Sequence, residues 1–312
     1  MKKYKKLLVV LILSLILLTG CTKQLRDGKT PVTNEETGQS LTANILCQPK
    51  DEALYNKYQE YNDSLTIKLE DLPTCESFTP KKLKYKSLWE TIFIKPLAYI
   101  ILKLGYLVKN MGLSVMIIGL LIRLIMMPIQ IKTVMQSENM KKIQPEMAKI
   151  EKKYQNKTDN ESLMAKSQET MLLYKKYKIN PISGCLIAFI QLPIFFAFLE
   201  AINRVPAIFE GSFLTMNLGT TPLFGITHKQ YIYIALLALI IITTILSFRK
   251  SMAGNQNNEM MGQMKYMFIF MIVMVSFASL SLPTAIALYW IVTNGFAVIQ
   301  NAIIKKIIEK RK

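Results

Sequence analysis

Several residue patterns on which enzymes and pumps depend are missing from this 312-residue sequence. It contains one histidine, His228, and no Cys/His cluster with the spacing of a zinc site. No segment matches the phosphate-binding pattern GxxxxGK followed by Ser or Thr. The long apolar stretches contain no pair of carboxylates for acid–base chemistry. We therefore expect no catalytic residues, no metal, no cofactor and no ATP-driven pump in this chain.

Apolar residues are abundant and are separated from the charged ones. They make up 51% of the chain, and the mean hydropathy is +0.25 although 19% of the residues are charged. A transmembrane helix needs about 20 consecutive apolar residues. Such stretches predict five membrane spans, at 107–131, 182–204, 230–248, 265–281 and 284–304. The expected fold class is an all-α integral membrane protein.

The first residues are typical of a lipoprotein signal. A basic start, MKKYKK, precedes the apolar LLVVLILSLILL, and LTGC ends the segment at Cys21. This order predicts a signal peptide at 1–20 that is cleaved before a lipid-modified Cys21. An uncleaved N-terminal anchor helix is the alternative. In the first interpretation, 21–83 is an extracytoplasmic, lipid-anchored segment, with a flexible tether as its default role.

Four cysteines are present, and two of them, besides Cys21, lie in this outer segment. Cys47 and Cys75 are placed where a disulfide can persist. Their spacing alone leaves open whether they are bridged. Cys185 lies in the second span, where it is expected to act as a small apolar residue.

Lysine and arginine are distributed unequally among the loops. Segment 132–180 holds eleven Lys and six acidic residues, whereas 205–229 holds one Lys and one Glu. The loop 249–264 and the tail 305–312 are also basic. Because basic loops stay in the cytoplasm, we expect the N-terminus outside and the C-terminus inside. The net charge of +18 then follows mostly from orientation, and it favours anionic membrane lipids rather than DNA as partners.

One arginine, Arg123, interrupts the apolar first span. It lies nine positions before Lys132, the expected cytoplasmic boundary, or about 14 Å deep at about 1.5 Å per residue. The third, fourth and fifth spans contain no Asp or Glu, and Glu200 lies far from the midpoint of the second span. We therefore expect Arg123 to face a hydrated cavity without a resident acidic partner. Pairing with backbone carbonyls or lipid phosphate is the alternative.

Residues near the depth of Arg123 extend the predicted cavity. Met116, Gly119 and Met127 share a helical face with Arg123, since they are spaced three or four residues apart. Gln191 reaches a similar depth from the second span. Methionine is flexible and polarizable, so this surface suits varied partners. Lipid-facing filler is the alternative for these methionines.

Two further segments have amphipathic patterns. Segment 84–104 mixes Trp, Tyr and Lys with aliphatic residues and is expected to lie in the outer membrane interface. An extension of the first span is the alternative. Segment 132–180 is expected to form a cytoplasmic helical hairpin, because two helical patterns flank the turn NKTDNE. Its second helix is expected to turn Leu163, Met164, Met171 and Tyr174 toward the first. The hairpin either receives a client segment or is a solvated cap.

Taken together, these motifs resemble the YidC/Oxa/Alb family of membrane protein insertases, in particular the Gram-positive lipoprotein type. The matching stretches are RLIMMPIQIK from Arg123, MKKIQPEM, NPISGCLIAFIQLPIFFAFLEAI, MNLG, and PTAIALYWIVTNGFAVIQN from Pro283. The chain departs from the family pattern at Ile187, where proline is frequent, and at Ala285 and Ile286, where glycine is common. These departures concern local helix geometry.

The resemblance implies an insertase that moves hydrophobic segments of nascent proteins into the bacterial cytoplasmic membrane without nucleotide hydrolysis. It also implies a groove centred on Arg123, with Gln191 and Trp290 at matching family positions. Expected partners are nascent membrane proteins, the Sec translocon and the ribosome. The alternative from the residues alone is a small-anion transporter with Arg123 as its substrate site.

Overall fold

The computed structural model describes residues 22–310 except 82, 84–86, 180–182 and 253–258. The predicted signal peptide at 1–20 and the lipidation site at Cys21 lie outside the described residues. The chain forms two compact units, which we describe separately. Unit 1 comprises Met1–Leu121, Phe189–Ile240 and Ser276–Thr293. Unit 2 comprises Ile122–Ala188, Ile241–Val275 and Asn294–Lys312.

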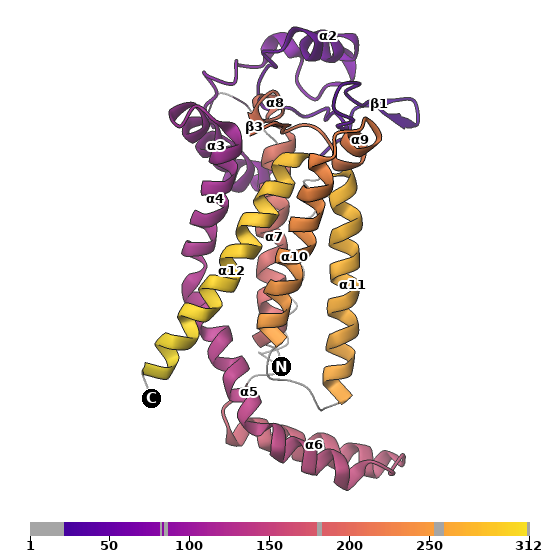
Figure 1. Cartoon of the computed structure of the whole chain (residues 1–312), viewed down its shortest axis with the longest axis vertical. Coiled ribbons are helices and arrows are strands. Elements are labelled where there is room, and N and C mark those ends of the chain that lie inside the picture. The colour runs from indigo at the N-terminus through magenta and orange to yellow at the C-terminus, as the bar shows by residue number, and fades with distance from the viewer. Residues whose placement is uncertain (1–21, 82, 84–86, 180–182, 253–258, 311–312) are drawn as a thin grey trace. The chain divides into compact units, whose positions relative to one another are not determined.

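Long helices dominate the chain, as the apolar runs predict (Figure 1). They are α4 (Met111–Ile125), α5 (Met127–Tyr154), α6 (Asn160–Lys176), α7 (Ser183–Asn203), α10 (Ile232–Met252), α11 (Glu259–Ser281) and α12 (Thr284–Lys310). Among the described residues, Thr284–Ile308 alone is long and apolar enough by itself to cross a membrane. Shorter apolar helices cover Pro193–Asn203, Ile232–Ser247 and Ile272–Ser281. The count of five spans stays a prediction.

The C-terminal tail is part of the last helix. α12 continues past the predicted end of the fifth span at 304 and runs through Lys310. Lys305 lies in the extension, and its Nζ is 3.8 Å from Oε1 of Glu138 on α5. The separation into a span and a basic tail is therefore not seen in the backbone.

The predicted first span at 107–131 is not one continuous helix, and its assignment as a membrane span stays a prediction. α4 ends at Ile125, α5 begins at Met127, and their axes differ by 56°. Pro128 lies in the first turn of α5, where its missing N–H is tolerated. A proline also disfavours helical geometry at the residue before it, which favours a break in this region. Met127 therefore does not continue a straight helical face with Met116, Gly119 and Arg123.

A helix with two apolar faces precedes α4 in unit 1. One π-helical turn, η4 (Glu90–Ile94), leads into α3 (Lys95–Leu107), which has Pro96 in its first turn. Ala98, Ile101 and Leu102 are buried on one side, while Ile92, Phe93, Ile100 and Leu107 are exposed. The Ser114 hydroxyl donates to the Ile101 carbonyl oxygen at 2.6 Å and joins α4 to α3. An outward apolar face suits the predicted interfacial position, which stays a prediction.

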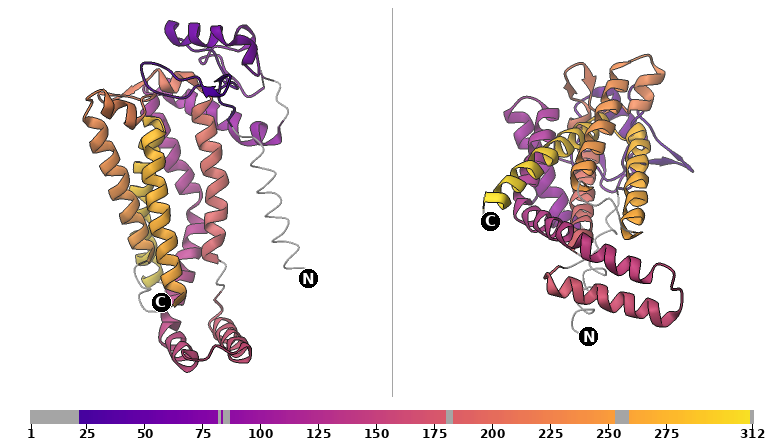
Figure 2. Two further views of the ribbon diagram at one scale, coloured as in Figure 1. Left: turned by 90° about the vertical axis from the view of Figure 1, so that its right-hand side faces the viewer. Right: turned by 60° about the horizontal axis from the view of Figure 1, so that its bottom comes forward.

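In unit 2, α5 and α6 form an antiparallel pair (Figure 2). Asp159 caps α6 by accepting a hydrogen bond from the Ser162 backbone N–H at 2.8 Å. The buried residues between the helices are Ile143, Met147, Leu173, Tyr174 and Ile179. Leu163, Met164 and Met171 were expected in this contact but are exposed, so that part of the prediction is wrong. The apolar residues of α6 lie on more than one helical face, so spacing alone does not say which face packs on α5. In the structure, the face that carries Leu173 and Tyr174 makes this contact.

Two reciprocal clusters of charged and phenolic groups join α5 to α6. Glu169 on α6 accepts hydrogen bonds from Lys153 and from the Tyr154 hydroxyl, the latter at 3.0 Å. Glu146 on α5 accepts hydrogen bonds from the Tyr177 hydroxyl and from Lys176. In each cluster, an adjacent Lys and Tyr at the C-terminal end of one helix bind a glutamate of the other helix. The end of α5 thus binds α6, and the end of α6 binds α5.

These clusters make the hairpin sensitive to acid. Hydrogen bonds from Tyr177 and Lys176 lower the pKa of Glu146, and those from Lys153 and Tyr154 lower the pKa of Glu169. A carboxyl group whose pKa is lower in the folded state than in the unfolded state, where it is about 4.3, stabilises the folded hairpin at pH values above about 4.3. This stabilisation is lost as the pH falls through the pKa of the folded state. We expect amide-exchange protection of α6, corrected for chemical exchange, to fall between pH 7 and pH 3.

Removing the carboxylates should reproduce the acid effect at neutral pH. In the Glu146→Gln, Glu169→Gln double variant, α6 protection at pH 7 should fall roughly two- to fivefold, as for exposed ion pairs. Its response to acid should also flatten. Glu161→Gln is the matched control, because Glu161 is exposed on α6 outside both clusters. Unchanged protection in the double variant would contradict this interpretation.

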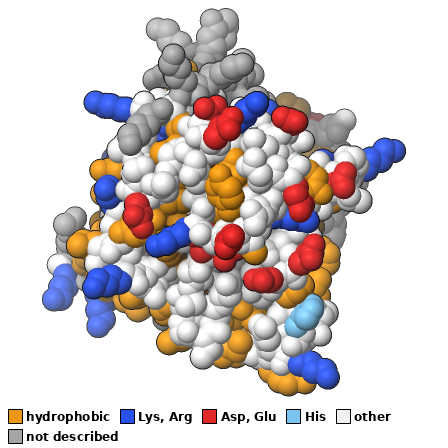
Figure 3. Space-filling model, turned by 90° about the horizontal axis from the view of Figure 1, so that it is seen from above, with side chains coloured by type: hydrophobic (Ala, Val, Ile, Leu, Met, Phe, Trp, Pro, Cys, Tyr) orange, Lys and Arg blue, Asp and Glu red, His pale blue; other side chains and the backbone are white. Residues whose placement is uncertain are grey.

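Residues 22–81 are folded, so the expectation of a flexible tether is wrong. This segment contains the antiparallel pair β1 (Arg26–Asp27) and β2 (Thr30–Pro31), the helix α2 (Glu52–Glu60), and the 3-10 turns η2 (Asn62–Ser64) and η3 (Leu69–Asp71). Cys47 and Cys75 form a disulfide. Its buried apolar side chains include Leu25, Leu41, Leu46, Leu69 and Phe78. We call residues 22–83 the cap. Figure 3, a view of the molecule from above, shows acidic and basic side chains interspersed on its surface.

The segment of unit 1 that follows α7 is built from short elements. They are α8 (Pro206–Phe209), β3 (Ser212–Phe213), β4 (Met216–Asn217) and α9 (Pro222–Thr227), with β3 and β4 antiparallel. Glu210 accepts hydrogen bonds from the backbone N–H groups of Lys50 and Asp51, at 2.7 and 3.1 Å. The cap is therefore joined to the segment that follows α7.

A buried arginine makes the main polar connection of the cap. Arg204 follows α7, and its side chain is 0% exposed. Its Nε donates to the Asn44 carbonyl oxygen at 2.7 Å, and its Nη1 donates to Glu90 at 2.7 Å. The Arg204 backbone oxygen also accepts a hydrogen bond from the Leu46 N–H at 2.8 Å. The guanidinium thus joins the cap to η4 and to the end of α7.

Candidate functional site

Arg123 lies in the last turn of α4, in unit 2, and is half-buried. Its backbone oxygen accepts a hydrogen bond from Nε2 of Gln300 on α12, at 3.4 Å. Arg123 takes part in further interactions within the chain, so the expectation of an arginine without a resident partner is not supported. Since Gln300 is 3% exposed, its amide approaches the arginine position from the interior of unit 2.

A second side-chain amide connects two apolar helices of unit 2. Asn294 on α12 donates through Nδ2 to the Thr244 hydroxyl on α10, at 3.0 Å. Thr244 is buried, and polar groups inside hydrocarbon need such partners. The sequence reasoning missed both Asn294 and Gln300 as site candidates. Their signal was two amides within the otherwise apolar run VTNGFAVIQ.

In unit 1, an aromatic side chain of α7 packs against the predicted site residue Trp290. Trp290 is half-buried on α12, and its ring stacks on Phe195 of α7 with centroids 5.7 Å apart. The neighbouring Tyr289 stacks on Phe198 at 4.1 Å. α7 and α12 therefore share an aromatic interface in this unit. Gln191 lies on α7, but its side chain is outside the described residues.

Gly119 permits the close approach of α4 to α12. A Cβ atom added at Gly119 would lie 2.8 Å from the Tyr289 ring and 3.1 Å from the Thr293 methyl group. The Thr293 hydroxyl donates to the Tyr289 carbonyl oxygen at 2.7 Å, which fixes its orientation. Gly119 is thus a packing residue of unit 1. Met116, which is half-buried, lies one turn earlier on α4.

A matched pair of glycine substitutions tests this packing. In Gly119→Ala, overpacking should cost about 1–3 kcal/mol. The higher helix propensity of alanine should offset about 1 kcal/mol of this cost, so a net destabilisation of the purified protein is expected. Gly295→Ala should be neutral or stabilising, because a Cβ at Gly295 meets no atom within 4 Å. Thermal unfolding in detergent measures both. Equal melting temperatures for the two variants would contradict a close contact at Gly119.

The predicted site residues are divided between the two units. Met116, Gly119 and Trp290 belong to unit 1, whereas Arg123 and Met127 belong to unit 2. A groove that includes all of them stays a prediction. Within the described part of the chain, no group of three or more His, Cys, Asp and Glu residues is arranged to hold a metal ion.

Comparison with known proteins gives a consistent family. The family model described as 60Kd inner membrane protein matches residues 103–311, which contain every long helix from α4 to α12. The protein named membrane protein insertase YidC of Oceanobacillus iheyensis is 34% identical over 233 residues, covering 74% of this chain and 88% of that protein.

Other relatives match over a smaller share of their length. Membrane protein insertase YidC 1 of Listeria monocytogenes is 40% identical over 182 residues, covering 58% of this chain and 59% of the relative. Membrane protein insertase MisCA of Bacillus subtilis is 37% identical over 183 residues, covering 58% of this chain and 65% of the relative. From the matched family model and these identities, the chain belongs to the YidC/Oxa family of 60Kd inner membrane proteins.

Proposed function

We propose that this chain is a membrane protein insertase that places hydrophobic segments of nascent proteins into the bacterial cytoplasmic membrane. The observation that carries the proposal is the family match over residues 103–311, together with relatives named as insertases. The apolar helices of the chain suit a protein that works in the bilayer. The proposal includes a cytoplasmic membrane location, with the N-terminus outside and lipid-anchored through Cys21 and with the C-terminus inside.

In this proposal, clients pass through a hydrophilic groove centred on Arg123. Gln191, Trp290, Met116 and Met127 contribute the surrounding client-contacting surface, and Gly119 allows α4 to pack closely on α12. The amides of Gln300 and Asn294 support a polar interior in unit 2, because they lie on the apolar helix α12 next to α4 and α10. The guanidinium attracts acidic or carbonyl groups of the polar segment that the client must translocate.

The energy for insertion comes from the client. Transfer of apolar surface out of water yields about 25 cal/mol per Å². A membrane potential adds about 2.3 kcal/mol per charge per 100 mV and draws acidic segments outward. Moving the polar segment of the client across the hydrocarbon core is unfavourable, because each unsatisfied backbone group there costs several kcal/mol. A groove that hydrates this segment lowers the barrier, so nucleotide hydrolysis is not required.

The α5–α6 hairpin is proposed to meet clients on the cytoplasmic side. Its outward face on α6 carries Leu163, Met164, Met171 and Leu172, all more than half exposed. Flexible methionine side chains adapt to varied apolar sequences. Ribosomes and the Sec translocon are the proposed sources of these clients. The rival function, a small-anion transporter, is not favoured, because the relatives are named insertases.

Site-specific crosslinking tests the client path. A photoreactive residue at 123, 191 or 290 should crosslink to a ribosome-held single-span protein during its translation in membrane vesicles. The same residue at exposed Thr30 of the cap is the control and should give no adduct. Adducts equally strong at position 30 and within the groove would contradict the proposed path. Saturable anion flux without adducts would favour the transporter.

A further inference from the structure

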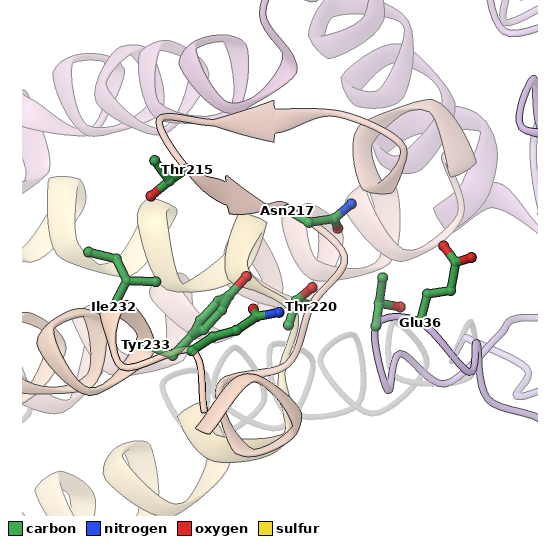
Figure 4. Close-up of a pocket in the computed structure, with 8 residues that line it drawn as sticks. Glu36, Thr215, Asn217, Thr220, Ile232 and Tyr233 are labelled. Atoms are coloured by element: carbon green, nitrogen blue, oxygen red, sulfur yellow. The ribbon is translucent and has the colours of Figure 1, made fainter. Parts of the chain in front are cut away.

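A polar cavity of about 350 Å³ lies in unit 1 (Figure 4). Three segments that are distant in sequence form it: the cap, the stretch from β3 to α9, and the start of α10. The lining includes Glu36, Thr37, Asn217, Thr220, Gln230 and Tyr233. The volume is within the range of small-molecule pockets.

Two residues of the lining with hydroxyl groups, Tyr233 and Thr220, are buried and are held in place by contacts outside the cavity. The Tyr233 side chain is 1% exposed, and its ring lies so close to Gly225 that an added Cβ there would be 2.2 Å away. Thr220 is 4% exposed, and its carbonyl oxygen accepts hydrogen bonds from the N–H and hydroxyl of Thr284, at 3.0 and 2.7 Å. Both positions are therefore fixed by packing and backbone contacts.

These fixed groups have unused hydrogen-bonding capacity. Neither the Tyr233 hydroxyl nor the Thr220 hydroxyl bonds to any other residue that the structure describes. Asn217 uses Oδ1 to accept from the Gly219 N–H at 2.7 Å, which leaves its amide nitrogen directed elsewhere. Buried polar groups normally have partners. A ligand with hydroxyl or carbonyl groups would supply them here.

The charge of the cavity selects among polar ligands. Among the described residues that line the cavity, Glu36 is the one that carries a charge, and none is Lys or Arg. A carboxylate favours a cationic amine and repels a bare phosphate. The cavity therefore suits a ligand that carries an amine together with hydroxyl or carbonyl groups.

Apolar residues beside the cavity suit a ligand that is part of a lipid. Ile232 is exposed and lines the cavity, and its neighbour Tyr231 is 69% exposed. Leu214, next to the lining residue Thr215, is 80% exposed. Exposed Ile234 and Leu239 continue the apolar surface along α10. In a membrane protein these residues face acyl chains, so a headgroup in the cavity keeps its chains in hydrocarbon.

We propose that this cavity binds the amine-bearing headgroup of a lipid in the outer leaflet, of the aminoacyl-phosphatidylglycerol class. The amine pairs with Glu36, and the headgroup hydroxyl and ester oxygens bond to Tyr233, Thr220 and Asn217. The binding is reversible and non-covalent, and it is separate from the insertion of clients. The site would give this protein a preference for membranes that contain the cationic lipid.

Native mass spectrometry of the full chain tests the proposal. The purified protein is incubated with equal amounts of lysyl-phosphatidylglycerol and phosphatidylglycerol in detergent. We expect the wild-type protein to retain the lysyl lipid about tenfold more, which corresponds to about 1.4 kcal/mol. Glu36→Gln should reduce this preference to about twofold or less. Tyr233→Phe with Thr220→Val should reduce retention of the lysyl lipid.

Glu35→Gln is the matched control for Glu36→Gln. Glu35 is the adjacent acid, lies 3.7 Å from Lys57, and does not line the cavity. It should leave the preference unchanged. Equal retention of both lipids by the wild type, or equal effects of the two substitutions, would overturn the site. Competition by soluble lysinamide that is as strong as by the lysyl lipid would overturn the assignment to a lipid.

Discussion

Replacing Arg123 by glutamine should reduce insertion of single-span clients with an acidic outer segment about tenfold, whereas Arg123→Lys should retain most of the activity. Glutamine keeps hydrogen-bonding groups but removes the charge, and a tenfold effect corresponds to about 1.4 kcal/mol. Lysine keeps the charge but not the bidentate geometry of a guanidinium. Protease protection of a radiolabelled client in proteoliposomes measures the inserted fraction.

The contrast between clients separates charge recognition from general damage. A client whose outer segment is neutral should be affected less by Arg123→Gln, because there is no acidic group to attract. Lys132→Ala is the control for loss of a positive charge, since Lys132 is exposed on α5, nine residues further along the chain. It should insert both clients normally. Equal activity of Arg123→Gln and the wild type would refute the electrostatic role of Arg123.

Replacing Arg204 by methionine should destabilise unit 1 by about 3–5 kcal/mol, the usual cost of removing one partner of a buried ion pair. The substitution leaves Glu90 without its guanidinium and leaves the Asn44 carbonyl oxygen without its donor. The cap should then separate from the end of α7 before the helices unfold. Thermal unfolding in detergent and limited proteolysis of residues 22–83 measure the two effects.

A double variant distinguishes the ion pair from loss of side-chain volume. Arg204→Met with Glu90→Leu removes both charges, so it should recover part of the stability lost in Arg204→Met. Arg26→Met is the control, because Arg26 is an exposed arginine of the same cap. A melting temperature of Arg204→Met equal to that of the control would show that the buried pair contributes nothing.

The long apolar helices and the pairing of α5 with α6 could be predicted because their signals are local. Apolar runs of sufficient length predict helices wherever they occur, and the turn around Asp159 marks the start of α6. The bend after α4 also has a local signal, Pro128, but the continuous apolar run concealed it. The site residues on α4 follow from helical spacing only as far as that bend.

The cap and its attachment could not be predicted because their contacts are distant in sequence. Arg204 and Glu90 are 114 positions apart, and Arg204 and Asn44 are 160 apart. The cap has no regular apolar period, so its fold depends on irregular packing and on the Cys47–Cys75 disulfide. A polar composition suggested a tether, although a small buried core was present.

Insertion by the purified protein alone tests the central claim most directly. The full chain is reconstituted in liposomes without the Sec translocon or nucleotide, and a single-span client is synthesised in their presence by purified ribosomes. The proposed function predicts a protease-protected client fragment well above that of protein-free liposomes, and a lower amount with Arg123→Gln. A protected fraction equal to that of protein-free liposomes would contradict the claim that this chain is itself an insertase.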